Sequence, residues 1–466
     1  MRRNDKKCER PLLGSYEVTL KLINYDLVLE PHVFLDVEPI RHLLTYDAKF
    51  KNFKTLPMYF AEIKQYLFSK YAVKIEFPYE EKLSFDTVTN YALRPYQEDA
   101  LSKWIENNFR GIICLPTGTG KTFLGLDAIH KTKNKTLIIV PTINLLHQWR
   151  RNVIEGLEIS KENIGIWGGG KQELNEITIT TYDSAHIYVK RFQNAFDLLI
   201  FDEVHHLPAP TYRVIAEGTI ASKRIGLSAT PERSDDLHQD LDFLVGKVVY
   251  RLEHEELVDD GYVAPFELKP IIIELTEDEK TRYDALDKTY RDYVQKYRVF
   301  DFEKLVLRSG RDKKAREALL ARQEARKISF GGGEKLATLE ELLVQHQHDR
   351  IIIFCEFNDI VHAIAKRFII PLITHKTKAE ERRIILDNFR NGQYSKLVTG
   401  KVLDEGWDVQ ANVGIIVSGS GSKRQFIQRL GRILRPKKEM ESKKKAILYE
   451  LITKETLEVS TASRRK

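Results

Sequence analysis

The sequence predicts an α/β protein with two parallel-sheet units, a small α+β unit before them and a helical insertion early in the second. Short apolar runs alternate with helical patterns from residue 89 to about 245, and a second set of such runs follows residue 334. Such continuous apolar runs are typical of parallel strands that are covered by helices on both faces. The 466 residues also exceed what one hydrophobic core organises. We therefore expect domains at 1–88, 89–245 and 246–466, with the insertion at about 277–330.

Residues 1–88 have the pattern of a small separate α+β domain. Tyr16 to Leu20 and Tyr71 to Phe77 are short runs of β-branched and aromatic residues, which favour strands. An amphipathic pattern near 55–70 predicts one helix. No catalytic motif occurs in this region, so we expect the chemistry to lie further along the chain.

The strands of the two larger units are predicted from their apolar runs. The first unit should contain strands at 111–115, 136–140, 177–181, 197–201 and 224–228. The second should contain strands at 350–355, 396–399, 412–417 and 446–451. Two units with this common pattern suggest a pair of nucleotide-fold domains with a cleft between them.

The insertion is predicted to be a helical hairpin. Thr276 and Glu279 form a capping box, after which aromatic and apolar residues recur at helical spacing up to Tyr297. Gly310 interrupts the pattern, and Asp312 is placed to cap a second helix that ends near residue 328. The aromatic seam is interpreted as packing, with base stacking as the alternative. Three glycines at 331–333 are expected to form a flexible joint.

The composition, 42% hydrophobic and 30% charged, is typical of a soluble globular protein. No apolar run has the length of a membrane span, and the start of the chain has no apolar signal core. We therefore expect a cytoplasmic or nuclear protein without a membrane partner. The cysteines Cys8, Cys114 and Cys355 lie far apart, so buried free thiols are expected in place of a zinc site or disulfides.

Positive charge is concentrated in particular segments. The net charge is +7, while residues 304–327 alone carry nine Lys and Arg against three Asp and Glu. A second basic run extends from Arg435 to Lys445. Such runs suit the phosphates of a nucleic acid, and a solvated helix face is the alternative.

The segment LPTGTGKT at 115–122 has the pattern of a phosphate-binding loop between a strand and a helix. Gly118 and Gly120 allow successive N–H groups to point at one phosphate. Lys121 is expected to reach the β- and γ-phosphates, and the Thr122 hydroxyl to bind Mg²⁺. A leucine replaces the usual first glycine, and an ordinary glycine turn is the alternative for this loop alone.

A second segment supports nucleotide chemistry. The apolar run 198–201 is followed directly by Asp202 and Glu203, so a buried strand delivers two carboxylates at its C-terminal edge. One carboxylate would hold magnesium, and the other would orient or deprotonate the attacking water. Together the two segments predict a chain that binds ATP or a similar triphosphate with Mg²⁺ and hydrolyses it. The adjacent His205 is interpreted as a polar coupling residue, with an ordinary histidine as the alternative.

Three further segments carry weaker signals. Arginines three apart in QRLGRILR at 428–435 share one helix face and suit the charge of a γ-phosphate, although a surface helix with salt bridges is the alternative. Acids on the loop at 404–408 would meet a ribose or these arginines. Gln97 offers a donor and an acceptor to an adenine edge, and alone this signal is weak.

The order of the motifs resembles the superfamily 2 helicases. From about Leu93 to the C-terminus the chain carries, in order, RPYQ, LPTGTGKT, VPTINLLHQW, TTYDS, DEVHH, LSAT, IIIFCEF, VTGKVLDEGWDV and QRLGRILRP. This pattern is similar to the archaeal XPB-like helicases, in which the helical insertion is called the thumb. The resemblance implies two RecA-like helicase domains. Residues 1–88 lie where XPB-like proteins carry a damage-recognition domain, and this match rests on position and size alone.

The resemblance assigns roles to matching residues. The catalytic residues would be Lys121, Glu203, Gln428, Arg432 and Arg435, the two arginines acting as arginine fingers. The nucleotide would be bound by Arg94, Gln97, Gly118, Thr119, Gly120, Lys121, Thr122, Gly406 and Asp408. The metal ligands would be Thr122 and Asp202. The DNA contacts would be Thr142, Thr181, Ser184, Arg233 and Thr399, to which the basic arm adds Arg311, Lys314 and Arg322.

Two positions depart from the family pattern. The Arg-Glu-Asp element of the family appears here as Arg233-Ser234-Asp235, which bears on strand separation more than on ATP hydrolysis. Trp407 replaces a smaller apolar residue, and no consequence follows from the sequence.

The resemblance implies an ATP-dependent DNA translocase or helicase with 3′-to-5′ polarity that acts in nucleotide excision repair or promoter opening. Its cofactors would be ATP and Mg²⁺, and its partners would be DNA, whether duplex, single-stranded, forked or damaged, and an endonuclease. An RNA helicase or restriction-type translocase is one alternative. A scaffold protein with a dormant ATP site is the other, and the intact catalytic motifs argue against it.

Overall fold

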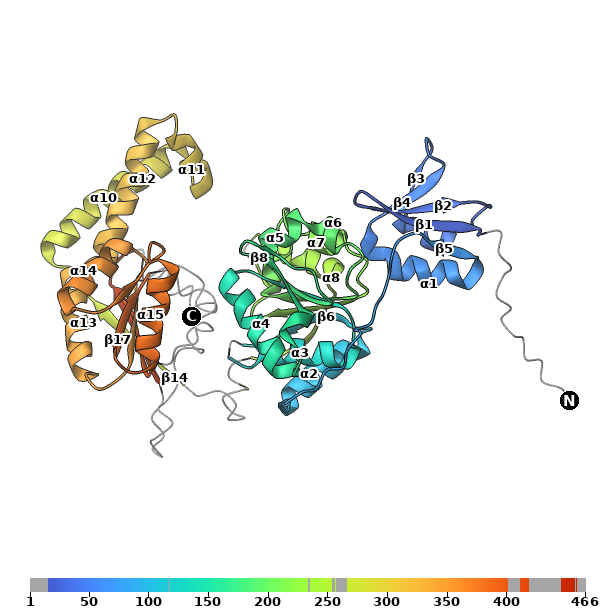
Figure 1. Cartoon of the computed structure of the whole chain (residues 1–466). Helices are drawn as coiled ribbons and strands as arrows, with labels where there is room; N and C mark the ends of the chain where they lie inside the picture. The colour runs from blue at the N-terminus through green and yellow to red at the C-terminus, as the bar shows by residue number, and fades with distance from the viewer. Residues whose placement is uncertain are drawn as a thin grey trace. The chain divides into compact units, whose positions relative to one another are not determined.

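The computed structural model describes residues 16–116, 118–233, 235–253, 256, 266–400, 411–418, 446–456 and 458 (Figure 1). The chain divides into two compact units, Met1–Glu253 and His254–Lys466. Within the described ranges, no helix is both long enough and apolar enough to cross a membrane.

The first unit begins with a five-stranded sheet in the order β3-β4-β2-β1-β5. Its elements are β1 (Val18–Ile23), β2 (Asp26–Pro31), η1 (Glu38–Leu43), β3 (Thr45–Asp47), β4 (Asn52–Thr55), η2 (Pro57–Tyr59), α1 (Phe60–Lys70) and β5 (Val73–Ile75). Alternate residues of β1 and β2, among them Leu20 and Leu29, belong to one hydrophobic cluster together with Ile63 and Leu67 of α1. The expected α+β fold and its helix are confirmed.

This N-terminal region shares packing with the larger sheet that follows it. Ile220 lies in the same hydrophobic cluster as β1, β2 and α1, and the rings of Tyr59 and Phe243 lie 6.1 Å apart. The chain then runs along the larger sheet, where the Val88 N–H donates to the Leu157 carbonyl. The N-terminal region and the larger sheet accordingly belong to one compact unit, Met1–Glu253.

The larger sheet of the first unit has eight strands in the order β13-β6-β12-β11-β7-β10-β8-β9. The strands are β6 (Arg110–Cys114), β7 (Thr136–Val140), β8 (Ile164–Gly168), β9 (Lys171–Gln172), β10 (Ile177–Thr181), β11 (Leu198–Asp202), β12 (Lys223–Ser228) and β13 (Val248–Arg251). The five predicted strands are confirmed, and β8, β9 and β13 were not predicted. Because β13 pairs with β6, this sheet extends beyond the boundary expected after residue 245.

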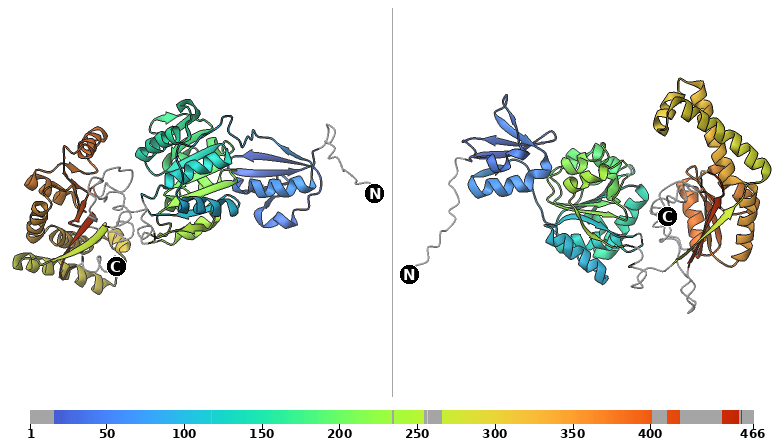
Figure 2. Two further views of the ribbon diagram at one scale, coloured as in Figure 1. Left: turned by 90° about the horizontal axis from the view of Figure 1, so that it is seen from below. Right: turned by 180° about the vertical axis from the view of Figure 1, so that it is seen from behind.

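Helices cover both faces of this sheet (Figures 1 and 2). They are α2 (Pro95–Glu106), α3 (Lys121–Thr132), α4 (Ile143–Leu157), η3 (Lys161–Asn163), α5 (Tyr182–Ile187), α6 (Val189–Phe192), η4 (Val204–His206), α7 (Val214–Glu217), η5 (Leu237–Asp240) and α8 (Leu241–Leu244). Residues of α5 to α8 pack with Leu137, Leu199 and Phe201 on one face. Ile200, which alternates with them, faces Gly125 of α3 on the other. This two-sided burial explains the continuous apolar runs.

The second unit contains a parallel sheet of six strands in the order β14-β19-β18-β15-β17-β16. Its elements are β14 (Phe266–Ile273), α13 (Gly333–Gln345), β15 (Ile351–Phe354), α14 (Asn358–Phe368), β16 (Leu372–Ile373), α15 (Ala379–Arg390), β17 (Lys396–Thr399), β18 (Val413–Ile416) and β19 (Ala446–Thr453). Ile351 and Ile353 pack in one core cluster and Ile352 in another, so this sheet is also buried on both faces. The four predicted strands are confirmed. β14 was missed, and its Pro270 is tolerated because the strand lies at the sheet edge.

The predicted helical hairpin is present as α10 (Glu277–Tyr297), α11 (Phe302–Ser309) and α12 (Lys313–Gly331) (Figure 1). The capping box of Thr276 and Glu279 forms, and the Asp312 carboxylate accepts from the first N–H groups of α12. Tyr293 is buried with Leu305 between the helices, which supports packing as the role of the aromatic seam. The three glycines form a tight junction in place of the expected flexible joint, because Gly332 alone separates α12 from α13 and the Gly333 N–H donates to Glu279 Oε1 at 2.9 Å.

Candidate functional site

The phosphate-loop motif lies between β6 and α3, as its sequence predicts. Gly118 and Gly120 have φ values of 80° and 83°, a region that residues with a Cβ rarely adopt. Lys121 begins α3 and is 6% exposed, and its ammonium donates to the Leu115 carbonyl at 3.0 Å. A glycine-rich turn that leads into a helix N-terminus is suited to bind a phosphate. The residues of this loop therefore fit the triphosphate that the motif implies.

Gln97 supports this loop from α2. Its Oε1 accepts from the Arg94 N–H at 2.8 Å, and its Nε2 donates to the Thr119 carbonyl at 2.8 Å. The Tyr96 hydroxyl donates to the same carbonyl at 2.7 Å. A Cβ on Gly120 would lie 2.6 Å from Gln97 Nε2. Both ends of its amide thus have partners within the protein, through which Gln97 holds the loop, and its contact with adenine stays a prediction.

The acidic pair lies at the carboxyl end of β11, on the same sheet edge as the phosphate loop. Only β12 separates β11 from β6, and carboxyl ends of parallel strands form the usual ligand-binding edge. Asp202 is 8% exposed. Its Oδ2 accepts from the Trp149 indole N–H at 2.8 Å and its Oδ1 from the Glu203 N–H at 3.1 Å. A buried, oriented carboxylate beside a phosphate loop fits the magnesium that a triphosphate carries.

Glu203 adopts a left-handed backbone conformation, with φ 48° and ψ 57°. A non-glycine residue in this region costs about 1–3 kcal/mol, and such strain is concentrated at functional sites. The left-handed conformation of Glu203 turns the chain from β11 into η4. Glu203 Oε2 then lies 3.6 Å from His205 Nδ1. His205 Nδ1 also lies 3.3 Å from the hydroxyl of Ser228, the last residue of β12. This geometry supports the coupling role over an ordinary histidine, because His205 joins the acidic strand to the neighbouring LSAT segment.

Arg233 is held within the first unit by polar contacts. Its guanidinium forms a two-point ion pair with Asp235 at 2.9 and 2.6 Å, and Nη1 donates to the His205 carbonyl at 2.7 Å. The Arg233 hydrogen bond lowers the pKa of the Asp235 carboxyl to about 2. These contacts join Arg233 to the segment that follows the acidic strand, and its direct contact with DNA stays a prediction.

The expected DNA contacts of the first unit lie at helix starts on the sheet's carboxyl edge. Thr142 caps α4 by accepting from the Leu145 N–H, and Thr181 caps α5 by accepting from the Ser184 N–H. The chain between β8 and β9 was not recognised from the sequence, although its three consecutive glycines were a usable signal. A Cβ on Gly168 would lie 3.3 Å from Ser184 Oγ, and one on Gly169 would lie 3.6 Å from Ile143 Cγ2. This glycine turn therefore borders the starts of α4 and α5.

Among the expected motif residues of the second unit, Thr399 is the one that lies in the described part of the chain. Thr399, at the end of β17, is fully buried and its hydroxyl donates to the Gly400 carbonyl at 3.2 Å. The structure therefore gives this hydroxyl a partner within the protein, and its contact with DNA stays a prediction. The remaining predicted residues, Gly406, Asp408, Gln428, Arg432 and Arg435, lie outside the described residues, as do Ser234 and Trp407.

The basic arm divides into an exposed part and a packed part. Arg311 and Lys314 are exposed near the start of α12. Arg322 is packed between helices, because its guanidinium lies 4.8 Å from the Tyr290 ring centre and 4.7 Å from that of Phe302, and donates to the Tyr290 hydroxyl at 2.8 Å. Arg322 therefore braces the hairpin, which differs from its predicted phosphate contact.

Comparison with known proteins agrees with these motifs. Residues 90–233 match the family of the type III restriction enzyme res subunit, and residues 318–466 match the ERCC3/RAD25/XPB C-terminal helicase family. The chain is 39% identical over 430 residues to the DNA 3'-5' translocase XPB2 of Sulfurisphaera tokodaii, which covers 91% of this chain and 95% of that protein. The chain belongs to the XPB helicase family. Membership confirms the predicted family and enzyme class, and helicases use ATP.

More distant XPB relatives are longer than this chain. The DNA 3'-5' helicase XPB of Kineococcus radiotolerans is 30% identical over 386 residues, which cover 81% of this chain and 62% of that protein. The general transcription and DNA repair factor IIH helicase/translocase subunit XPB/SSL2 of Saccharomyces cerevisiae is 27% identical, and 82% of this chain covers 44% of it. The chain thus spans less than two thirds of these two relatives.

A solved structure shows the same fold. The helicase domain of Pyrococcus furiosus Hef matches with a TM-score of 0.54 at 18% identity, covering 80% of this chain and 98% of that one. The predicted α/β architecture of two RecA-like helicase domains is confirmed.

Proposed function

We propose that this XPB-family chain is an ATP-dependent DNA translocase and helicase that moves 3′ to 5′ along one strand. The observation that carries the proposal is the position of the phosphate loop and of Asp202 and Glu203 at one edge of one parallel sheet. The similarity to a protein named as a DNA 3'-5' translocase supplies the substrate and the polarity.

Hydrolysis would use the phosphate loop and the acidic strand of the first unit together with two arginines of the second. Lys121 would exchange its hydrogen bond to the Leu115 carbonyl for a phosphate oxygen, since the same ammonium can serve either acceptor. Thr122 and Asp202 would hold Mg²⁺, which supplies positive charge to the β- and γ-phosphates. Glu203 would orient the attacking water, because its left-handed backbone conformation sets the direction of its Cα–Cβ bond. Arg432 and Arg435 would stabilise the charge that develops on the γ-phosphate.

The biological setting belongs to the same proposal. Relatives are named for a general transcription and DNA repair factor, which supports nucleotide excision repair or promoter opening on chromosomal DNA. Forked or damaged DNA would be the substrate, and an endonuclease would be the partner that cuts it. Fork cleavage by a candidate endonuclease from the same organism, with and without this chain, tests the partner. Equal cleavage in both would contradict it.

Two alternatives remain testable against this proposal. One alternative is a restriction-type translocase, because residues 90–233 match a restriction-enzyme subunit family. The other is an RNA helicase, which would share the fold. The match of residues 318–466 to the XPB C-terminal family favours the XPB function over both.

The deciding experiment measures ATP turnover with no nucleic acid, with single-stranded DNA, with duplex DNA and with RNA. We expect DNA to stimulate turnover and RNA not to. Partial duplexes with either a 3′ or a 5′ tail then report polarity, and displacement should require the 3′ tail. Stimulation by RNA alone would indicate an RNA helicase, and absence of turnover under every condition would indicate a scaffold.

A further inference from the structure

We propose that Trp149 is a positioning residue for ATP hydrolysis, and that its indole N–H fixes the Asp202 carboxylate in the orientation that holds Mg²⁺. This inference rests on the proposed function, since it concerns how that same site is built.

The hydrogen bonds of Asp202 define its orientation. Trp149 Nε1 donates to Oδ2 at 2.8 Å, and the Glu203 N–H donates to Oδ1 at 3.1 Å. One donor on each oxygen resists rotation of the carboxylate about its terminal bond. Trp149 is 1% exposed and Asp202 is 8% exposed, and a hydrogen bond from a buried donor to an ionised acceptor is among the stronger kinds.

The helix that begins with Lys121 is shaped to admit this indole. A Cβ on Gly125 of α3 would lie 2.6 Å from Trp149 Cη2 and 3.2 Å from Cζ3. Glycine inside a helix is less favourable than alanine by about 1 kcal/mol, and the steric room for the indole gives this glycine a structural reason. The same side chain thus contacts the phosphate-loop helix and the metal carboxylate.

The other described tryptophans provide a comparison inside the same unit. Trp104 is fully buried and its Nε1 donates to the Arg224 backbone carbonyl at 2.9 Å. Trp167 is 8% exposed and its Nε1 has no hydrogen-bond partner. Among the tryptophans that the structure describes, Trp149 is therefore the one that donates to a carboxylate. Trp167 shows that a buried tryptophan in this unit can lack a hydrogen-bond partner for its indole N–H. Burial alone therefore does not explain the hydrogen bond that Trp149 donates to Asp202.

Groups that orient a metal ligand from behind have a measurable effect. Replacing such partners costs about 10–100-fold in metal affinity or activity. The Trp149→Phe variant keeps an aromatic side chain at this position and loses the N–H. It should therefore weaken the metal-dependent part of nucleotide binding while leaving the phosphate loop unchanged.

The experiment compares wild type with Trp149→Phe by titration calorimetry of a non-hydrolysable ATP analogue, with Mg²⁺ and with a chelator. We expect the gain in affinity that Mg²⁺ provides to fall by about tenfold, with metal-free affinity unchanged and kcat reduced. The controls are Trp167→Phe, which removes no hydrogen bond, and Trp104→Phe, which removes one to a backbone carbonyl. Both should retain the full Mg²⁺ gain.

A second variant guards against simple loss of folding. In Gly125→Ala the new methyl group displaces the indole from Asp202 while Trp149 and Asp202 remain in the chain. The same selective loss of the Mg²⁺ gain is expected. A full Mg²⁺ gain in Trp149→Phe, or an equal loss of affinity with and without Mg²⁺, would overturn the inference. If wild type itself shows no Mg²⁺-dependent hydrolysis, the proposed function fails instead, so the two failures are distinguishable.

Discussion

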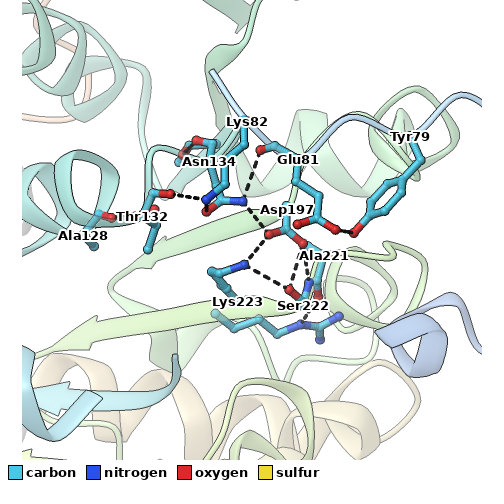
Figure 3. A network of polar contacts seen from close by, with 12 residues as sticks. Tyr79, Glu81, Lys82, Ala128, Thr132, Asn134, Asp197, Ala221, Ser222 and Lys223 are labelled. Carbon is cyan, nitrogen blue, oxygen red and sulfur yellow. Dashed lines mark hydrogen bonds and ion pairs between the residues drawn. The ribbon is translucent and has the colours of Figure 1, made fainter. Parts of the chain in front are cut away.

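Replacing Asp197 with alanine should destabilise the first unit strongly, because this buried carboxylate joins several segments (Figure 3). Its side chain is 1% exposed. It accepts from Lys223 Nζ at 2.5 Å, from Asn134 Nδ2 at 2.7 Å and from the Ser222 hydroxyl at 2.8 Å. Asn134 Nδ2 also donates to the Glu81 carbonyl at 3.1 Å. The network therefore ties the start of β11 to β12 and to the chain segment that follows β5.

The size of the effect follows from burial. Removing one partner of a buried ion pair costs about 3–5 kcal/mol because the other charge is left uncompensated. The Lys223 side chain is 18% exposed, so its ammonium keeps some contact with water and the lower end, about 3 kcal/mol, is expected. For a unit of this size each kcal/mol lowers Tm by about 2–4 °C, which gives about 6–12 °C.

The assay is scanning calorimetry of the full chain, with limited trypsin digestion as a local probe. Lys82 Nζ donates to the Thr132 carbonyl at 2.8 Å beside the network, so cleavage after Lys82 should become faster in Asp197→Ala. Glu80→Ala is the matched control, since Glu80 is 80% exposed and pairs with Lys135 at the surface. Such surface pairs contribute little, and no measurable change in Tm is expected. A Tm within about 2 °C of wild type for Asp197→Ala, with unchanged digestion, would refute this account of the network.

Three further predictions concern activity. Lys121→Ala and Glu203→Gln should each abolish ATP turnover in a steady-state assay with the fold retained by circular dichroism, and Glu203→Gln should still bind ATP; substantial turnover by either would contradict the catalytic assignment. Arg432→Ala should lower turnover by about 10³-fold if it acts as an arginine finger, whereas near-normal turnover would make it a surface salt-bridge residue. Reversing the charges of Arg311 and Lys314 should weaken DNA binding and lower the slope of log K against log salt by about 0.7–0.9 for each lost phosphate contact. An unchanged slope in DNA titrations at several salt concentrations would make the arm a solvated helix face.

The sequence predicted elements whose signals are local. Strands buried on both faces, such as β7 and β11, were found because each contains four consecutive apolar residues, Leu137 to Val140 and Leu198 to Phe201. Asp312 was recognised as a cap because its partners are the next few N–H groups. The edge strand β14 was missed because Pro270 is a negative signal for a strand, and its pairing with β19 joins residues far apart in the sequence.

The site residues, too, were predicted where the signal is local in the sequence, whereas their contacts with distant partners were not. The phosphate loop and the acidic strand were identified because backbone geometry and adjacent carboxylates carry their chemistry. Gln97 and Arg322 were given ligand roles because their side chains suit adenine and phosphate. The structure engages them with Thr119 and Tyr290. Composition cannot reveal such engagement, since the partner is fixed by the fold and not by spacing along the chain.

The segment Arg233-Ser234-Asp235, which departs from the family pattern at its central residue, keeps the interaction between its two outer residues. The two outer residues hold each other by a two-point ion pair, and Arg233 also donates to the His205 carbonyl. His205 in turn contacts Ser228 and approaches Glu203. Arg233 and Asp235 therefore connect this segment to the hydrolytic carboxylate through His205. Loss of the central acid is thus compatible with intact ATP hydrolysis, and its consequence should be confined to strand separation.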